Sequence, residues 1–141
     1  MSDTLRAVGT IFVNNNEEIL LLLREGSIPE GGLWGLVGGK IDKNEGKLDA
    51  AIREIKEEIG VDIAPSDLKF VKTYTYHWDK GDKKIEFETF KSDFKEGAEL
   101  SLDTSENVKY MWILPEEAYK RKDLMIGLYK ILLDLYNLKE A

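Results

Sequence analysis

At 141 residues, 43% of them hydrophobic and 33% charged, the chain has the size and composition of a globular protein, and we expect a single domain over residues 1–141. A net charge of −7 argues against a nucleic-acid-binding surface, and no apolar run approaches the roughly 20 residues that span a membrane. The absence of cysteine excludes disulfides, thiolate zinc sites and thiol nucleophiles, and it makes a reducing cytoplasm the expected compartment.

The first part of the chain predicts three strands. Apolar residues fill two of them, and consecutive asparagines at 14–16 supply the turn between them. The run of leucines from Leu20 to Leu23 is typical of a strand that is buried on both faces. The expected strands cover residues 5–13, 18–24 and 33–37, and residues 25–32, which contain Pro29 and end in two glycines, are expected to form a loop.

A single amphipathic helix is predicted over residues 47–59. Gly60 follows the last apolar position and is a typical helix stop. The apolar stripe at helical spacing, which would pack against a sheet, consists of Leu48, Ala51, Ile52, Ile55 and Ile59.

Three glutamates share one side of this predicted helix. At about 100° per residue, Glu57 lies about 60° to one side of Glu54, and Glu58 lies about 40° to the other. Such like-charged neighbours each destabilise a helix by roughly 0.2–0.5 kcal/mol, and the helix dipole disfavours anions close to Gly60. A sequence that breaks local rules in this way usually has a functional reason. Converging carboxylates suit a hard divalent cation, of which Mg²⁺ is the default.

The second half of the chain predicts a hairpin, another strand and two helices. Polar residues and a glycine at 79–82 separate two strand-like segments, and Pro115 is a typical first residue of a helix. The order of elements predicts an α/β or α+β fold with a mixed sheet between helices. The expected segments are strands over residues 70–78, 85–94 and 108–114, a short helix from Pro115, and a final amphipathic helix over residues 124–138.

The stretch from Gly39 to Val61 also carries a recognisable pattern. In G-x5-E-x7-R-E-U-x-E-E-x-G-U, where U is a bulky apolar residue, every fixed position is filled, and a chance match is on the order of one in 10⁷ per register. This pattern is the signature of the Nudix hydrolases, which the chain therefore resembles. The matching residues are Gly39, Glu45, Arg53, Glu54, Ile55, Glu57, Glu58, Gly60 and Val61.

The resemblance implies an α/β/α sandwich and a small, MutT-like hydrolase. Nudix hydrolases cut the diphosphate linkage of a nucleoside diphosphate that is joined to a further group, X, with the help of Mg²⁺, for which Mn²⁺ can substitute. The resemblance also pairs Arg53 with Glu45, which would hold the metal ligands in place. The implied catalytic residues are Glu45, Arg53, Glu54, Glu57 and Glu58, and the implied metal ligands are Glu54, Glu57, Glu58 and the backbone carbonyl of Gly38.

The pattern leaves the general base open. Glu54 is the analogous base in MutT-type members, whereas other members use a glutamate outside the signature. Glu106 is favoured as a metal ligand or base, because it precedes the last predicted strand, where relatives often place an acid that faces the metals. The downstream candidates are Glu86, Glu88, Glu106, Glu116 and Glu117.

Arg24 and several aromatic residues are candidates for contact with the substrate. Arg24 ends the second predicted strand, at the spacing where MutT-type relatives carry an arginine near the nucleotide, and its planar guanidinium suits a phosphate or a base. His77, the only histidine, is expected to have a structural role. A base-stacking platform could come from Trp34, Tyr74, Tyr76, Trp78 and Trp112, although core or rim packing is the more frequent role of such residues.

The favoured function is a Mg²⁺-dependent pyrophosphohydrolase that acts on a small nucleotide, a nucleoside triphosphate before ADP-ribose or a diadenosine polyphosphate. The alternative is a Nudix domain that binds a nucleotide without catalysis and regulates a partner. An isomerase is disfavoured, because isopentenyl diphosphate isomerases of the same fold use an active-site cysteine and this chain has none. Neither nucleic acid nor a membrane is expected as a partner, and the sequence is compatible with a monomer or a homodimer.

Overall fold

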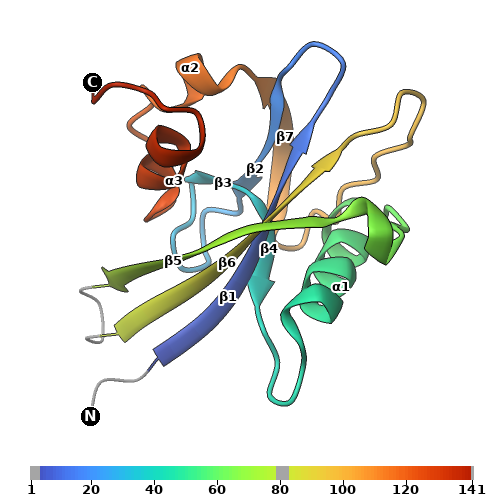
Figure 1. Ribbon diagram of the computed structural model, residues 1–141, viewed down its shortest axis with the longest axis horizontal. Helices are drawn as coiled ribbons and strands as arrows, with labels where there is room; N and C mark the ends of the chain where they lie inside the picture. The colour runs from blue at the N-terminus through green and yellow to red at the C-terminus, as the bar shows by residue number, and fades with distance from the viewer. Residues whose placement is uncertain (1–3, 79–82, 141) are drawn as a thin grey trace.

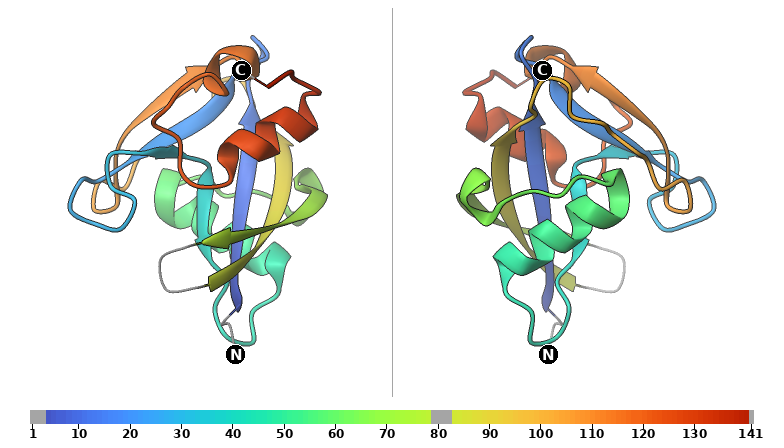
Figure 2. Two further views of the ribbon diagram at one scale, coloured as in Figure 1. Left: turned by 90° about the vertical axis from the view of Figure 1, so that its left-hand side faces the viewer. Right: turned by 90° about the vertical axis from the view of Figure 1, so that its right-hand side faces the viewer.

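The computed structural model describes residues 4–78 and 83–140, which form a mixed sheet between helices (Figure 1). Helix α1 covers one face of the sheet, and α2 and α3 lie on the other face (Figure 2). The α/β fold with a mixed sheet between helices is therefore confirmed. The strands are β1 (Thr4–Val13), β2 (Ile19–Arg24), β3 (Trp34–Gly35), β4 (Val37–Lys40), β5 (Lys69–Trp78), β6 (Lys83–Asp93) and β7 (Asn107–Ile113), and the helices are α1 (Lys47–Ile59), a 3₁₀ turn η1 (Pro65–Asp67), α2 (Pro115–Ala118) and α3 (Leu128–Leu135).

Strand β1 is the centre of the sheet and has different partners along its two edges. Along one edge it runs parallel to β6 over residues 4–13, and β6 pairs in turn with β5 as the predicted hairpin. Along the other edge it pairs with β2 at Val13 and with β4 from Ala7 to Thr10. The sheet therefore forks, because β2 turns away together with β3 and β7 while β4 takes its place beside β1.

Side chains of the central strands alternate between two hydrophobic cores. Val8 of β1 lies in the core under α1, whereas Ile11 lies in the core under α3. In β2, Leu20 and Leu22 join the first core and Leu21 joins the second, and all three are at most 1% exposed. The predicted burial of this strand on both faces is confirmed, and the two cores fix α1 and α3 on opposite faces of the sheet.

The predicted helix over residues 124–138 is shorter in the structure, where α3 covers Leu128–Leu135. Two hydrogen bonds of 2.8 Å join the backbone of residues 123–125 to Trp34 of β3, so this segment pairs with the sheet instead of coiling. Gly127, with φ at 85°, then sets the direction of the helix. The prediction was wrong at this end because hydrogen bonds to a distant strand outweighed helical periodicity.

Two smaller points complete the comparison with the predicted elements. The single strand expected over residues 33–37 is two strands, β3 and β4, which are separated at Leu36. The turn expected over residues 79–82 lies outside the described residues. In the described part of the chain, no helix is both long and apolar enough to cross a membrane.

Gly60 ends α1 in a conformation that other residues rarely adopt, and we expect Gly60→Ala to destabilise the protein by about 1–2 kcal/mol. Its φ is 71°, and an added Cβ would meet the Ser101 Cβ at 3.2 Å. The measurement is the free energy of unfolding from a urea titration. Gly26→Ala is the matched control, because an added Cβ there meets nothing within 4 Å. Equal effects of the two substitutions would contradict this account.

Candidate functional site

Helix α1 presents its three glutamates to two different environments. Glu54 and Glu58 are 9% and 5% exposed, and both face β4. The Glu57 side chain is 56% exposed. The acidic side of the helix therefore begins beneath β4 and opens into solvent, next to the apolar flank that packs on the sheet.

Gly39 lets the backbone of β4 approach Glu54 closely. An added Cβ at this position would lie 2.7 Å from the nearer carboxylate oxygen of Glu54, a distance that real Cβ contacts do not reach. Gly38 is equally constrained on its other side, where an added Cβ would collide with the backbone carbonyl of Val8. Glycine at both positions thus brings backbone atoms of β4 against the buried carboxylates.

Both carboxylate oxygens of Glu58 accept hydrogen bonds from the sheet. The backbone N–H of Gly38 donates to one oxygen at 2.6 Å, and the side-chain amide of Asn107 donates to the other at 2.9 Å. Burial, together with the negative charges of Glu54 and Glu106, nevertheless raises the pKa of Glu58 to about 8. The Glu58 carboxylate is thus held in place by two neutral donors, and neither of them balances its negative charge when it is ionised.

Asn107 is a site residue that the sequence reasoning missed. It is 3% exposed and begins β7, directly after the predicted acid Glu106. The signal in the sequence was a polar residue directly before a predicted strand, next to the carboxylate of Glu106. The negative charge of Glu106 contributes to the raised pKa of both Glu54 and Glu58, and its role as a metal ligand or base stays a prediction.

Arg53 pairs with Glu45, as the resemblance implies. Its Nε and Nη2 donate to the two Glu45 oxygens at 2.9 and 3.0 Å, and this pairing lowers the pKa of Glu45 to about 2. Its Nη2 also donates to the Lys40 carbonyl at 3.1 Å, and its Nη1 donates to Glu54 at 3.0 Å and to Glu57 at 3.3 Å. One guanidinium thereby ties the loop after β4 to α1 and orients two of the acids.

The donor set fits a hard cation. Oxygen atoms predominate, and burial is the main cause that raises the pKa of both Glu54 and Glu58. A divalent cation would relieve that surplus of negative charge. Within residues 4–78 and 83–140, no three acidic or histidine side chains are already gathered into a metal-binding cluster. The reason is that Arg53 lies between Glu54 and Glu57, while Glu58 turns toward Asn107.

The other acidic candidates lie away from this group or are already bound. Glu88 is buried, where it pairs with the Lys47 ammonium at 3.3 Å and accepts a hydrogen bond from Thr73 at 3.0 Å. Glu86 lies two residues before Glu88 in β6, opposite Arg6 near the start of β1. Glu116 and Glu117 lie on α2, and the seven residues of β7, roughly 20 Å of strand, separate them from the loop that carries Glu106.

A cavity of about 470 Å³ extends from these acids into the fork of the sheet. Glu58, Gly38 and Asn107 line one end, and apolar side chains line most of the rest. Arg24, the predicted substrate residue, is part of the lining. Its Nε donates to the Pro29 carbonyl at 3.0 Å, which fixes the guanidinium at the wall.

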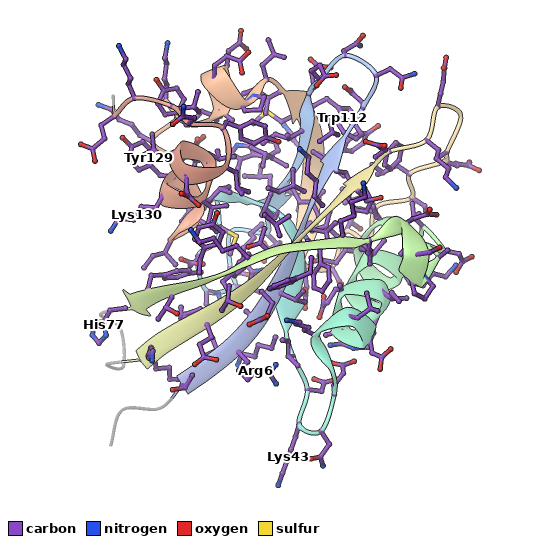
Figure 3. The ribbon with its side chains drawn as sticks, in the orientation of Figure 1. Arg6, Lys43, His77, Trp112, Tyr129 and Lys130 are labelled. Carbon is purple, nitrogen blue, oxygen red and sulfur yellow. The ribbon has the colours of Figure 1, made fainter. Side chains whose placement is uncertain are left out.

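Of the four candidate aromatic residues whose side chains the structure describes, Tyr76 alone lines this cavity. Tyr74 donates a hydrogen bond to Asp134 at 2.6 Å. Trp112 packs against the edge of Phe94, and Trp34 lies beneath Arg121. The Trp78 side chain lies outside the described residues. Figure 3 shows His77 pointing outward at the end of β5.

Comparison with known proteins adds to this geometry. The sequence profile of the NUDIX domain matches residues 3–135, which is nearly the whole chain. The chain belongs to the Nudix family. The resemblance that the Gly39–Val61 signature indicated is thereby confirmed.

Individual Nudix relatives are similar over shorter stretches. A putative 8-oxo-dGTP diphosphatase of Bacillus subtilis is 43% identical over 56 residues, which are 40% of this chain and 35% of the relative. The CTP pyrophosphohydrolase of Escherichia coli is 34% identical over 50 residues, which are 36% of this chain and 37% of the relative. The chain thus spans well under half the length of the curated relatives it matches.

Solved structures share the fold over the whole chain. A MutT protein from Methanosarcina mazei superposes with a TM-score of 0.79, at 22% identity and with 98% of each chain covered. A MutT Nudix hydrolase from Burkholderia pseudomallei gives a TM-score of 0.77, also at 22% identity, with 94% of this chain and 98% of that chain covered. The fold is therefore that of the MutT-type Nudix proteins.

In metal-free buffer, Glu58→Gln should raise the melting temperature at about pH 8–9 and have little effect below about pH 4. The folded protein raises the pKa of Glu58 from 4.5 to about 8, so it holds a proton that the unfolded chain releases. Between about pH 4.5 and 8, the unfolded chain therefore loses a proton that the folded protein keeps, and the free energy of unfolding falls progressively as the pH rises. Glutamine stays neutral, and Asn107 can turn its amide to preserve a hydrogen bond. The measurement is a set of melting curves across this pH range.

Glu117→Gln serves as the control, because it removes the same charge from an exposed position on α2. Its melting temperature should follow that of the wild type at every pH. A difference between Glu58→Gln and the wild type that stays constant from acid to alkaline pH would contradict this account of the buried carboxylate.

Proposed function

We propose that the chain is a divalent-metal-dependent pyrophosphohydrolase that cleaves the diphosphate linkage of a nucleoside diphosphate joined to a group X, with a nucleoside triphosphate as the favoured substrate. The observation that carries the proposal is the position of Glu58, which belongs both to the acidic group on α1 and to the lining of an apolar cavity. A substrate could therefore place its phosphates beside the acids and its organic part in the cavity.

In this proposal the acids of α1 hold the metal, with Mg²⁺ expected and Mn²⁺ as a substitute. The ligands would be Glu54, Glu57, Glu58 and the backbone carbonyl of Gly38, with Glu106 contributing from the loop before β7. When bound, the metal would neutralise phosphate charge and lower the pKa of a water molecule.

Two arginines have distinct proposed roles. Arg53 contacts the loop after β4 and two of the acids, and so it orients ligands without touching the substrate. Arg24 lies in the cavity wall, and no acidic side chain among the described residues pairs with it, so its guanidinium is available to a phosphate.

Glu54 is the proposed general base, and the surroundings of the alternatives support this choice. A base must reach a water molecule at the phosphorus that is attacked. Glu88 is bound by Lys47 and Thr73, and the glutamates of α2 lie at the far end of β7. Glu54 lies against β4 beside Gly39, within the acidic group, and burial raises its pKa, which favours proton acceptance.

The apolar lining of the cavity suits the organic part of a substrate, such as a nucleobase. Met125 and Tyr76 both line it, and each packs against a glycine. An added Cβ on Gly35 would collide with the Met125 sulfur, and one on Gly127 would lie 2.5 Å from the Tyr76 ring. The two glycines thus leave space in the cavity wall that the Met125 and Tyr76 side chains occupy.

The substrates named for the matched relatives, 8-oxo-dGTP and CTP, are small nucleotides and support a nucleoside triphosphate here. An Ap4A hydrolase and an enzyme with ADP-ribose pyrophosphatase activity share the fold, which keeps diadenosine polyphosphates and ADP-ribose as alternative substrates. A domain that binds a nucleotide without turnover is the second candidate function, because a cavity and a metal site are sufficient for binding.

A product-resolved hydrolysis screen tests the proposal. The substrates are canonical and oxidised nucleoside triphosphates, ADP-ribose and diadenosine polyphosphates, assayed with Mg²⁺, with Mn²⁺ and with a chelator. We expect hydrolysis that chelation abolishes, that added metal restores, and that Glu58→Gln reduces by roughly 100-fold or more, because a metal ligand is lost. The products identify the bond that is cut.

Glu117→Gln again controls for the loss of one negative charge, and it should keep full activity. Nucleotide binding without turnover in the wild type would favour the binding domain over the enzyme. Hydrolysis that persists unchanged in the chelator would overturn the metal-dependent mechanism.

Gly35→Ala should impair substrate binding more than chemistry. The added methyl group would push Met125 into the cavity, so we expect KM to rise roughly tenfold while kcat changes less. Steady-state kinetics on the best substrate of the screen give both constants. The double variant Gly35→Ala with Met125→Ala should recover the lower KM, because the displaced side chain is removed. A double variant no better than Gly35→Ala would show that the space is not used by the substrate.

A further inference from the structure

Among the described residues, the cavity is lined by one carboxylate besides that of Glu58. This is Glu30, on the loop between β2 and β3, which lines the wall beside Ile126. Its backbone has a φ of 60°, a left-handed conformation that is uncommon for a residue other than glycine. Such conformations persist where the surroundings fix them, and they occur frequently at binding sites.

One carboxylate oxygen of Glu30 is fixed by the opposite wall. It accepts a hydrogen bond from the backbone N–H of Ile126 at 3.2 Å, across 96 positions of sequence. Ile126 lies beside Met125, and both line the cavity. Glu30 therefore joins two walls of the cavity, and its carboxylate is held at that junction.

The second oxygen of Glu30 has no basic partner in the described part of the chain. The ion pairs of residues 4–78 and 83–140 do not include Glu30, although Lys83 lines the same cavity. Burial is the main cause that raises the pKa of Tyr76, and the negative charge of Glu30 is the second cause. An acceptor without a partner thus lies near the ring that lines the apolar part of the cavity.

We infer that Glu30 is a specificity-determining residue, whose second carboxylate oxygen accepts a hydrogen bond from the exocyclic amino group of a nucleobase. This inference rests on the proposed function, since it assigns the cavity to the base of the substrate. An amino group at this position donates to the carboxylate, whereas an oxo group would point its lone pairs at a negative charge. Amino-substituted bases such as cytosine and adenine should therefore be preferred over their oxo counterparts.

Glu30→Gln is the decisive substitution, because it changes the chemistry of the second position alone. The amide oxygen of glutamine can still accept the Ile126 N–H bond, so the junction of the walls is preserved. The amide nitrogen then replaces the second oxygen and presents donors where the wild type presents an acceptor. A preference for amino groups should become indifference or a preference for oxo groups.

The experiment compares pairs of nucleotides that differ in this group but keep the same ring system. CTP is paired with UTP, and ATP with ITP, and kcat/KM is measured for each with Mg²⁺. In at least one pair we expect the wild type to favour the amino member roughly tenfold or more, and Glu30→Gln to lower that ratio roughly tenfold or more. Glu117→Gln, which removes an equal charge from α2, should keep the ratio of the wild type.

A binding measurement separates failure of this inference from failure of the proposed function. Dissociation constants for the same four nucleotides are determined by calorimetry for all three proteins. If hydrolysis is absent but the amino preference in binding falls in Glu30→Gln, the enzyme proposal fails and the role of Glu30 stands. Equal wild-type binding and turnover within both pairs, or a preference that Glu30→Gln leaves unchanged, would overturn the inference. Absence of both binding and hydrolysis would overturn both proposals.

Discussion

The burial of Glu58 is the constraint on which the rest of the site depends. A carboxylate that is 5% exposed, beside a second buried acid, is costly to ionise, and its raised pKa reflects that cost. The neighbouring elements are arranged around it. Strand β4 supplies the Gly38 N–H and β7 supplies the Asn107 amide, while Arg53 binds the neighbouring Glu54. These contacts hold the carboxylate in one orientation without neutralising it, which leaves an electrostatic need that a cation would meet.

The fork in the sheet connects this acidic group to a space for the substrate. If β2 had stayed beside β1 along its length, the position of β4 would be filled and its glycines would not reach α1. Because β2 turns away, β4 pairs with β1 and packs against α1, and residues of the fork line the cavity. Topology therefore explains why a group of buried acids and an apolar cavity are adjacent in this molecule.

The parts of the site that the sequence predicted are those that are local in sequence. Helix α1 follows from the spacing of apolar residues within one segment, and the pairing of Arg53 with Glu45, in the loop before that helix, was implied by the resemblance to the Nudix signature. Asn107 could not be placed, because it reaches Glu58 only through the pairing of β7 with β2, 49 positions away from Glu58 in sequence. The predicted start of the last helix was wrong for the same reason. The backbone hydrogen bonds that join Trp34 to residues 123–125 form between segments about 90 positions apart. Periodicity contains no information about such partners.

The Gly39–Val61 signature leaves the substrate open because it covers only one end of the site. Most of the acidic end of the site, namely the three glutamates of α1, two glycines and one arginine, lies within residues 38–58. The other end depends on the β2–β3 loop and on residues 123–127, which Glu30 joins by one hydrogen bond. Changes in those loops can reshape the pocket while the buried core residues stay in place, because Leu124 is the one residue of 123–127 that packs against a core. Under the proposed function, selectivity for the base can therefore vary independently of the chemistry at the phosphates, and it has to be inferred from the three-dimensional positions of residues such as Glu30.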